Sequence, residues 1–121
     1  MSRYVDGYVI PIKKTKLAAY RRMAAQAGKV WMDHGAVGFM ECAGEELKTK
    51  FGGSFTKLAK AKPGETVLLS FVVYKSRRDR DRVNAKVEQD PRLAAIMKAN
   101  APMPIDMKRV TYGGFSALVD L

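Results

Sequence analysis

The sequence has very little of the two residue types that most often carry metal binding and nucleophilic catalysis. Among 121 residues there is one histidine, His34, and one cysteine, Cys42. A single thiol excludes an intrachain disulfide, and no C-x-x-C or H-x-x-x-H pair supplies the ligand spacing of a zinc or iron site. We therefore expect no metal site, assign no cofactor, and interpret Cys42 as a small buried core residue.

Long apolar runs are also missing. No stretch approaches the roughly 20 apolar residues that a membrane-spanning helix needs, and the first 14 residues contain no continuous apolar segment of the kind found in secretory signals. The chain is nevertheless 47% apolar, enough to bury a core without disulfides. We expect a soluble, cytoplasmic protein with a single domain over residues 1–121.

Acidic residues are scarce relative to basic ones, with 12 Asp and Glu against 22 Lys and Arg and a formal net charge of +10. Such a charge permits binding to nucleic acid, anionic lipid or an acidic small molecule, and it also favours solubility. The basic residues are spread over several segments, chiefly 45–62 and 75–86, and form no basic tail. This distribution disfavours a dedicated nucleic-acid-binding protein.

Hydrophobic periodicity predicts four strands and two main helices. The strands are expected at residues 4–10, closed by Pro11, and at 37–43, 65–74 and 110–119. The helices are expected from Lys14 or Thr15 to Gly35 and from about Arg77 to Gln89, with a shorter helix beginning at Asp90-Pro91. Residues 44–64, rich in glycine and lysine, are expected to form an irregular insertion with one helical turn after Ser54.

The predicted order is β-α-β-β-α-β, which is the ferredoxin-like split unit of the α+β class, an antiparallel four-stranded sheet with helices on one face. Ser76 and Asp79 have the spacing of a helix-capping box. Gly113-Gly114, inside the last strand, indicates a bulge or a close approach between backbones.

The sheet face without helices is predicted to be covered by a partner. In the strand at 65–74, the wholly apolar set Val67, Leu69, Phe71 and Val73 suits the helix side. The other set would then leave Leu68, Val72 and Tyr74 on the open face, together with Tyr4, Tyr8 and Ile10. Because an apolar patch of this size is unusual on a monomer, we expect a homodimer joined through the two sheet faces.

Four segments resemble a known family, namely YVDGYVIPI, AGKVWMDHGA, ETVLLSFVVYKSRRDRDRVNAKVEQDPR and MPIDMKRVTYGGFSALVDL. Together they are similar to the YbaA-like family of small bacterial proteins, a domain of unknown function within the dimeric α/β-barrel superfamily. The resemblance covers nearly the whole chain. It implies the ferredoxin-like fold and a dimer, and it implies no particular activity.

Topology predicts a cluster of polar groups where the first helix ends, because the first strand starts and the third strand ends at the same edge of the sheet. We expect His34, Tyr74 and Asp6 to be catalytic there, since an imidazole, a phenol and a carboxylate suffice for proton abstraction beside a carbonyl. Trp31, Ser70 and Arg77 are the expected ligand-binding residues. The predicted ligand is a small anionic or carbonyl-bearing molecule.

Structural explanations compete with each of these roles. Asp6 and Ser70 would form a hydrogen-bonded pair inside the sheet, Trp31 would be part of the core, and Asp106 and Arg109 would pair at a loop. Two other functions also compete with a small-molecule protein. One is an RNA-recognition module, disfavoured because Phe71 is assigned to the helix side, and the other is a structural or regulatory dimer without a ligand.

Overall fold

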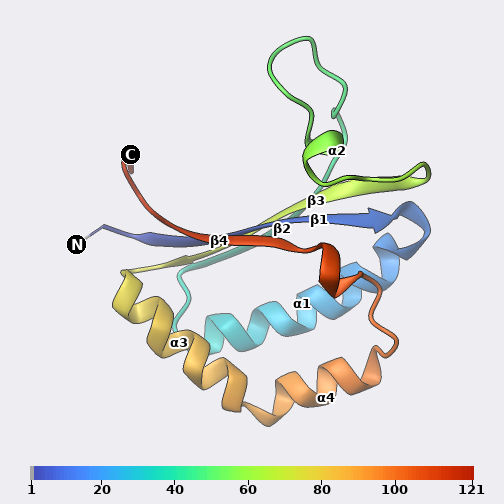
Figure 1. The fold of residues 1–121 in the computed structure, drawn as a ribbon. Coiled ribbons are helices and arrows are strands. Elements are labelled where there is room, and N and C mark those ends of the chain that lie inside the picture. The colour runs from blue at the N-terminus through green and yellow to red at the C-terminus, as the bar shows by residue number, and fades with distance from the viewer. Residues whose placement is uncertain (1) are drawn as a thin grey trace.

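A computed structural model describes residues 2–121 of the chain and contains one four-stranded sheet with three longer helices (Figure 1). The elements in chain order are β1 (Tyr4–Lys13), η1 (Lys14–Lys16), α1 (Leu17–Asp33), β2 (Gly38–Ala43), α2 (Phe55–Leu58), β3 (Glu65–Tyr74), α3 (Arg77–Gln89), α4 (Pro91–Ala99), η2 (Met107–Arg109) and β4 (Thr111–Ser116). In the described part of the chain, no helix is long and apolar enough to cross a membrane.

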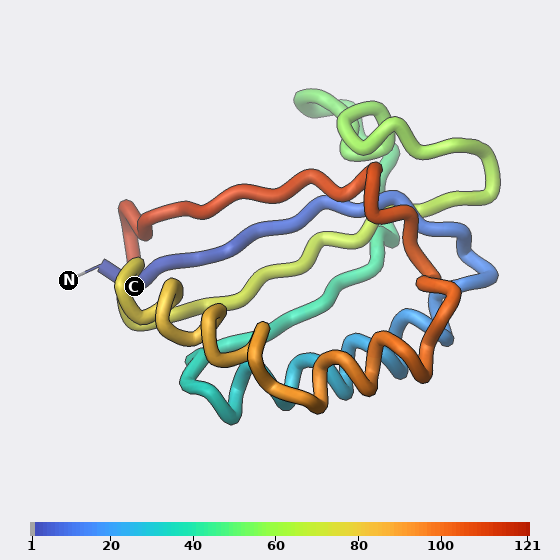
Figure 2. Tube along the Cα trace, turned by 60° about the horizontal axis from the view of Figure 1, so that its bottom comes forward, coloured from blue at the N-terminus to red at the C-terminus, as the bar shows by residue number. Residues whose placement is uncertain are grey.

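The sheet is antiparallel throughout, with the strand order β2-β3-β1-β4. Helices α1, α3 and α4 all lie on one side of it (Figures 1 and 2). The two ten-residue strands, β1 and β3, are therefore central, and the shorter β2 and β4 form the edges. This arrangement confirms the α+β ferredoxin-like architecture predicted from the sequence.

Helix starts lie where the capping residues predicted them. The Ser76 Oγ accepts a 3.1 Å hydrogen bond from the Asp79 amide, and Asp90 accepts one of 2.9 Å from the Arg92 amide. Ser54 caps the single turn of α2 in the same way. Each cap satisfies an amide that the first turn of a helix leaves without a partner.

Two strand ends differ from the prediction. β1 continues past Pro11 to Lys13, because β4 pairs with β1 only as far as Val9 and leaves one edge of β1 open where the proline lies. β4 ends at Ser116 and not at Val119. The chain leaves the sheet there, and the short 3₁₀ turn η2 before β4 was not predicted.

The predicted assignment of the two sheet faces was wrong. Leu68 packs against α1 with Tyr20 and Met23, while Val72 and Tyr74 lie in a second core cluster. The partners of these two residues in that cluster are Val30, Ala36, Val83 and Val87. The set expected on the open face therefore forms the core.

The open face is instead formed by the other set of alternating residues. Cross-strand register places on it Val5, Gly7, Val9 and Pro11 of β1, Val67, Leu69, Phe71 and Val73 of β3, Gly38, Met40 and Cys42 of β2, and Thr111, Gly113 and Phe115 of β4. None of these residues is charged; Met40, Leu69 and Phe115 are exposed, whereas Pro11 and Val67, at one end of the face, are buried. Cys42 is half-buried on this face. The prediction that it is a core residue was wrong.

Gly114 makes room for a side chain, and neither for the bulge nor for the second backbone that the sequence predicted within β4. A Cβ atom at this position would overlap the hydroxyl and ring of Tyr4, whose ring carries the Arg80 guanidinium 4.8 Å from its centroid. The glycine thus makes room for a stacked tyrosine and arginine at the end of the sheet.

Replacing Gly114 with alanine is expected to lower the free energy of unfolding by about 1–2 kcal/mol, because Tyr4 must move and its contact with Arg80 is lost. Urea unfolding measures the change. Gly53→Ala is the control, since a Cβ there meets open space and should change stability by less than about 0.5 kcal/mol. Equal effects of the two substitutions would show that the close approach carries no constraint.

Candidate functional site

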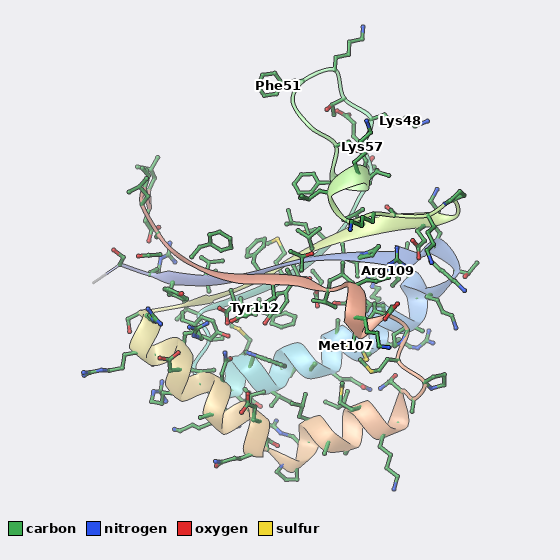
Figure 3. The ribbon with its side chains drawn as sticks, in the orientation of Figure 1. Lys48, Phe51, Lys57, Met107, Arg109 and Tyr112 are labelled. Atoms are coloured by element: carbon green, nitrogen blue, oxygen red, sulfur yellow. The ribbon has the colours of Figure 1, made fainter. Side chains whose placement is uncertain are left out.

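A cavity of about 240 Å³ lies between the sheet and the helices. We call it the under-sheet cavity. Its walls are mostly apolar and come from β1, α1, β3, α4 and the segment before β4; they include Tyr8, Ile10, Tyr20, Met23, Ala27, Trp31, Phe39, Val72, Leu93, Met97, Met103, Ile105, Met107 and Val110. Met107 lies beneath β4 on the side of the helices (Figure 3). Four methionines in the lining give the cavity an adaptable, polarizable surface.

Tyr20, Glu41 and Ser70 bring polar groups to the lining of this cavity. The Tyr20 hydroxyl donates to both carboxylate oxygens of Glu41, at 2.8 and 3.0 Å, and burial together with the charge of Glu41 raises the pKa of Tyr20. Tyr20 therefore stays a neutral donor. Glu41 is the cross-strand neighbour of Ser70.

Ser70 differs from its neighbours because its Oγ forms no hydrogen bond of normal geometry within residues 2–121, although it lies close enough to the Tyr20 hydroxyl to oppose the rise in the pKa of that phenol. The residue is 5% exposed and lines the cavity. A buried hydroxyl without a partner costs about 1–3 kcal/mol, so such groups usually have a reason. In this position the hydroxyl is free to bind a molecule inside the cavity.

A second compartment of about 360 Å³ adjoins the first and shares Tyr8, Trp31 and Leu93 with it. Asn84, Val87, Glu88 and Tyr112 complete its lining. Trp31 packs against Phe39 with ring centroids 6.1 Å apart, and its Nε1 donates to Asn84 Oδ1 at 3.2 Å. Trp31 is therefore a wall of both compartments.

A hydrogen-bond network centred on Asp6 runs beside the second compartment. Asp6 is fully buried on β1, and its carboxylate accepts from Arg80 Nη1 at 2.8 Å, from Tyr112 at 3.1 Å and from Asn84 Nδ2 at 3.4 Å. Asn84 Oδ1 in turn accepts from the Tyr74 hydroxyl at 2.9 Å. Burial and the nearby charge of Asp6 raise the pKa of Tyr74, which keeps the phenol protonated.

The network brings together three of the predicted site residues. Asp6, Tyr74 and Trp31 all meet at Asn84, a residue that the sequence analysis did not single out. Arg80 was also missed. A sequence signal for both existed, because Arg80, Val83, Asn84 and Val87 follow the spacing of one helix face and the two valines are fully buried.

His34 lies at the end of α1 but bonds elsewhere. Its Nε2 is 2.7 Å from Asp90 Oδ2, and Asp90 also accepts from Arg92. These hydrogen bonds, that from Arg92 first, hold the pKa of Asp90 well below its usual range. His34 therefore links α1 to the start of α4 and takes no part in the hydrogen bonds around Asp6.

The remaining predicted residues divide between the cavity and the surface. Ser70 lines the cavity and does not bond Asp6, so the expected Asp6–Ser70 pair was wrong. Arg77 is exposed in the first turn of α3 and lines neither compartment. The sequence analysis did not predict Glu41 and Tyr20 as cavity residues. The one available signal was for Glu41, which is a lone acid in the apolar strand predicted at 37–43.

The expected Asp106–Arg109 pair was also wrong. Both terminal nitrogens of Arg109 contact the Glu65 carboxylate at 2.8 Å, which lowers the pKa of Glu65 to about 2, and Nη2 also donates to the Lys60 carbonyl (Figure 3). Asp106 instead caps η2 by accepting from the Lys108 amide. The described residues contain no group of three or more His, Cys, Asp or Glu side chains that could hold a metal.

The strand order, the helices on one face and the cavity between them define a ferredoxin-like α+β protein. The chain belongs to the DUF1428 family of proteins of unknown function, whose model matches residues 3–107. It is 36% identical over 118 residues to the uncharacterized protein YbaA of Escherichia coli K12, covering 98% of each chain.

Solved structures share the fold at low sequence identity. A dimeric ferredoxin-like protein from an uncultured marine organism has a TM-score of 0.58 at 10% identity and covers 100% of both chains. A monooxygenase of Streptomyces coelicolor, in complex with the ligand nanaomycin D, has a TM-score of 0.53 at 13% identity, with 99% of this chain and 91% of that chain covered.

Proposed function

We propose that the chain is a homodimer that binds a mostly apolar small molecule with a carbonyl group in the under-sheet cavity. The observation that carries this proposal is Ser70, whose buried hydroxyl lines an apolar cavity without a partner. Apolar walls with one or two convergent polar groups are typical of small-molecule sites. The monooxygenase complex with nanaomycin D supports it, because a protein of the same fold holds an organic ligand.

The polar groups of the cavity favour a carbonyl over an anion. Ser70 can donate to a carbonyl oxygen, whereas the Glu41 carboxylate beside it repels a negative charge. Glu41 is suited to accept from a hydroxyl on the same ligand. Arg77, the anion partner expected from the sequence, lies outside the lining.

RNA recognition is disfavoured for a different reason from the one predicted from the strand pattern. Phe71 does lie on the open face, as an RNA-recognition module requires, but its neighbours across the strands are Gly7 and Met40. That face carries no charged side chain among its described members to meet a phosphate. A second copy of the chain suits such a surface better, and a dimeric protein of the same fold supports this choice.

The test of the ligand site uses 1-tetralone, a two-ring ketone, and tetralin, which lacks the oxygen. Trp31 is the single tryptophan of the chain and lines the cavity, so its fluorescence reports binding directly. We expect the wild type to bind tetralone more tightly than tetralin. Ser70→Ala should weaken tetralone binding about 3- to 10-fold, the value of one hydrogen bond, and leave tetralin unchanged.

Ser116→Ala serves as the matched control, because Ser116 is exposed at the end of β4. Ser70→Ala should also raise the free energy of unfolding by about 1 kcal/mol, since it removes a buried hydroxyl that has no partner. Weaker binding with higher stability is the signature of a functional hydroxyl. Equal tetralone affinity in both variants, or no binding to the wild type, would contradict the proposal.

A further inference from the structure

We infer that residues 44–64, which we call the arm, grip the flank of a second copy of this chain. The inference rests on the homodimer proposed above and adds a contact that orients the two copies. The arm lies between β2 and β3 and contains α2.

The arm stands on the side of the sheet opposite the helices (Figure 1). The C-terminal tail, residues 117–121, turns to the same side at the other end of the sheet (Figure 1). The open face lies between these two segments, which are far apart in sequence. Any body that covers the open face must therefore fit between the arm and the tail.

The base of the arm is fixed by hydrogen bonds. The Gly44 amide donates to the Val67 carbonyl at 2.8 Å, and the Thr66 hydroxyl donates to the Gly44 carbonyl at 3.2 Å. On the returning side, Arg109 donates to the Lys60 carbonyl at 2.9 Å. These contacts hold the direction of the arm relative to the sheet.

The arm displays exposed apolar side chains. Phe51, near its tip, is 93% exposed (Figure 3), Leu58 on α2 is 63% exposed, and Phe55 is partly covered. At the other end of the sheet, Leu118 and Val119 are exposed although Arg3 Nε bonds Asp120 at 2.7 Å and holds the tail. Exposed apolar groups on positioned segments mark an interaction surface.

The size of the open face also calls for additional contacts. Four strands spaced about 4.8 Å apart and about eight residues long give a flat footprint of roughly 500 Å² per copy. Stable interfaces bury about 800 Å² per partner. Pro11 and Val67, at one end of this face, are already buried within the chain, so the sheet offers less than its full footprint, and the arm and tail supply apolar surface directly adjoining it.

A second copy fits this surface because a two-fold dimer requires a self-complementary patch. Two sheets packed face to face lie about 10 Å apart, so a segment that stands out from the open face must run along the flank of the other copy. Each arm then contacts its partner in the same way. Phe51 and Leu58 provide the apolar contact on each side.

The test measures the dimer dissociation constant by sedimentation for the wild type, Phe51→Ser, Leu58→Ser and a control, Met32→Ser. Met32 is an exposed methionine on α1, on the opposite side of the sheet. We expect either arm substitution to weaken the dimer by about tenfold or more, because each is present twice in the interface, with Met32→Ser unchanged. Since Phe51 and Leu58 are exposed within one copy, the variants should fold normally.

Other results would overturn the inference. If both arm variants dimerise like the wild type, the arm does not grip the partner, while the sheet-face dimer and the Ser70 site stand. If the wild type is a monomer at every concentration, the dimer and the arm contact both fail, and tetralone binding still decides the ligand site. If Phe51→Ser instead abolishes sedimentation with phosphatidylglycerol vesicles and leaves the dimer unchanged, the arm binds a membrane surface.

Discussion

Replacing Asp6 with alanine is expected to lower the free energy of unfolding by about 3–5 kcal/mol, the usual cost of removing one partner from a buried ion pair. The Asp6 carboxylate is fully buried and accepts hydrogen bonds from Arg80, Tyr112 and Asn84. Without it, a guanidinium that is only 14% exposed loses its buried counter-charge. Urea unfolding followed by Trp31 fluorescence measures the change.

The same arginine provides the control. Arg80 Nε also bonds Asp81 at 2.7 Å, but Asp81 is largely exposed, so Asp81→Ala should cost less than about 1 kcal/mol. Asp6→Asn keeps the shape and one acceptor oxygen and should fall between the two alanine variants. Equal losses for Asp6→Ala and Asp81→Ala would contradict a stabilising role for the buried network.

The second large effect is expected on the open face, where Leu69→Lys should convert the dimer to a monomer at micromolar concentration. A lysine enclosed between two apolar sheets loses hydration without gaining a partner, which costs several kcal/mol in each copy. Met32→Lys is the matched control, because Met32 is 45% exposed and Leu69 is 44% exposed. Light scattering gives the mass of each variant.

Cys42 supplies an independent measurement of the same event. It lies on the open face as the cross-strand neighbour of Leu69. In a face-to-face dimer its thiol is covered, so a thiol reagent should modify Leu69→Lys faster than the wild type or Met32→Lys. A monomeric wild type, or equal thiol reactivity in all three proteins, would contradict the sheet-face dimer.

The architecture was predictable because its signals are local. The apolar run at 65–74, the caps at Ser76 and Asp90 and the restart at Pro91 each determine one element without reference to the rest of the chain. The orientation of the faces was not predictable in this way. Both alternating sets of β3 are apolar enough to be buried, so periodicity alone does not choose between them.

Buried polar residues decide the orientation, and their partners lie far away in sequence. Asp6 faces the helices because Arg80 and Asn84 of α3 meet it there, 74 and 78 positions along the chain. Placing Tyr4, Tyr8 and Ile10 on the open face ignored this requirement, because Asp6 alternates in step with them. The spacing of Arg80 and Asn84 with two buried valines was the available clue.

The structure brings Asp6, Tyr74 and Trp31 together at Asn84, whereas His34, predicted in the same cluster, lies outside these hydrogen bonds. Strand order brings the end of α1 to the expected edge of the sheet. However, α4 begins beside it, and the carboxylate of Asp90 hydrogen-bonds the imidazole of His34. Ser70 and Trp31 do line the cavity, as expected of ligand-binding residues. Their roles in binding stay predictions until the tetralone titration is done.

The uncharged open face also determines how association responds to ionic strength. In the proposed dimer, contact between the two open faces hides only neutral surface, so the sheet contact removes none of the net charge of +10 on each chain from solvent. The two copies repel each other at a distance, and dissolved salt screens that repulsion. Salt is therefore expected to tighten the proposed dimer, whereas it would weaken any complex in which the same lysines and arginines hold a nucleic acid.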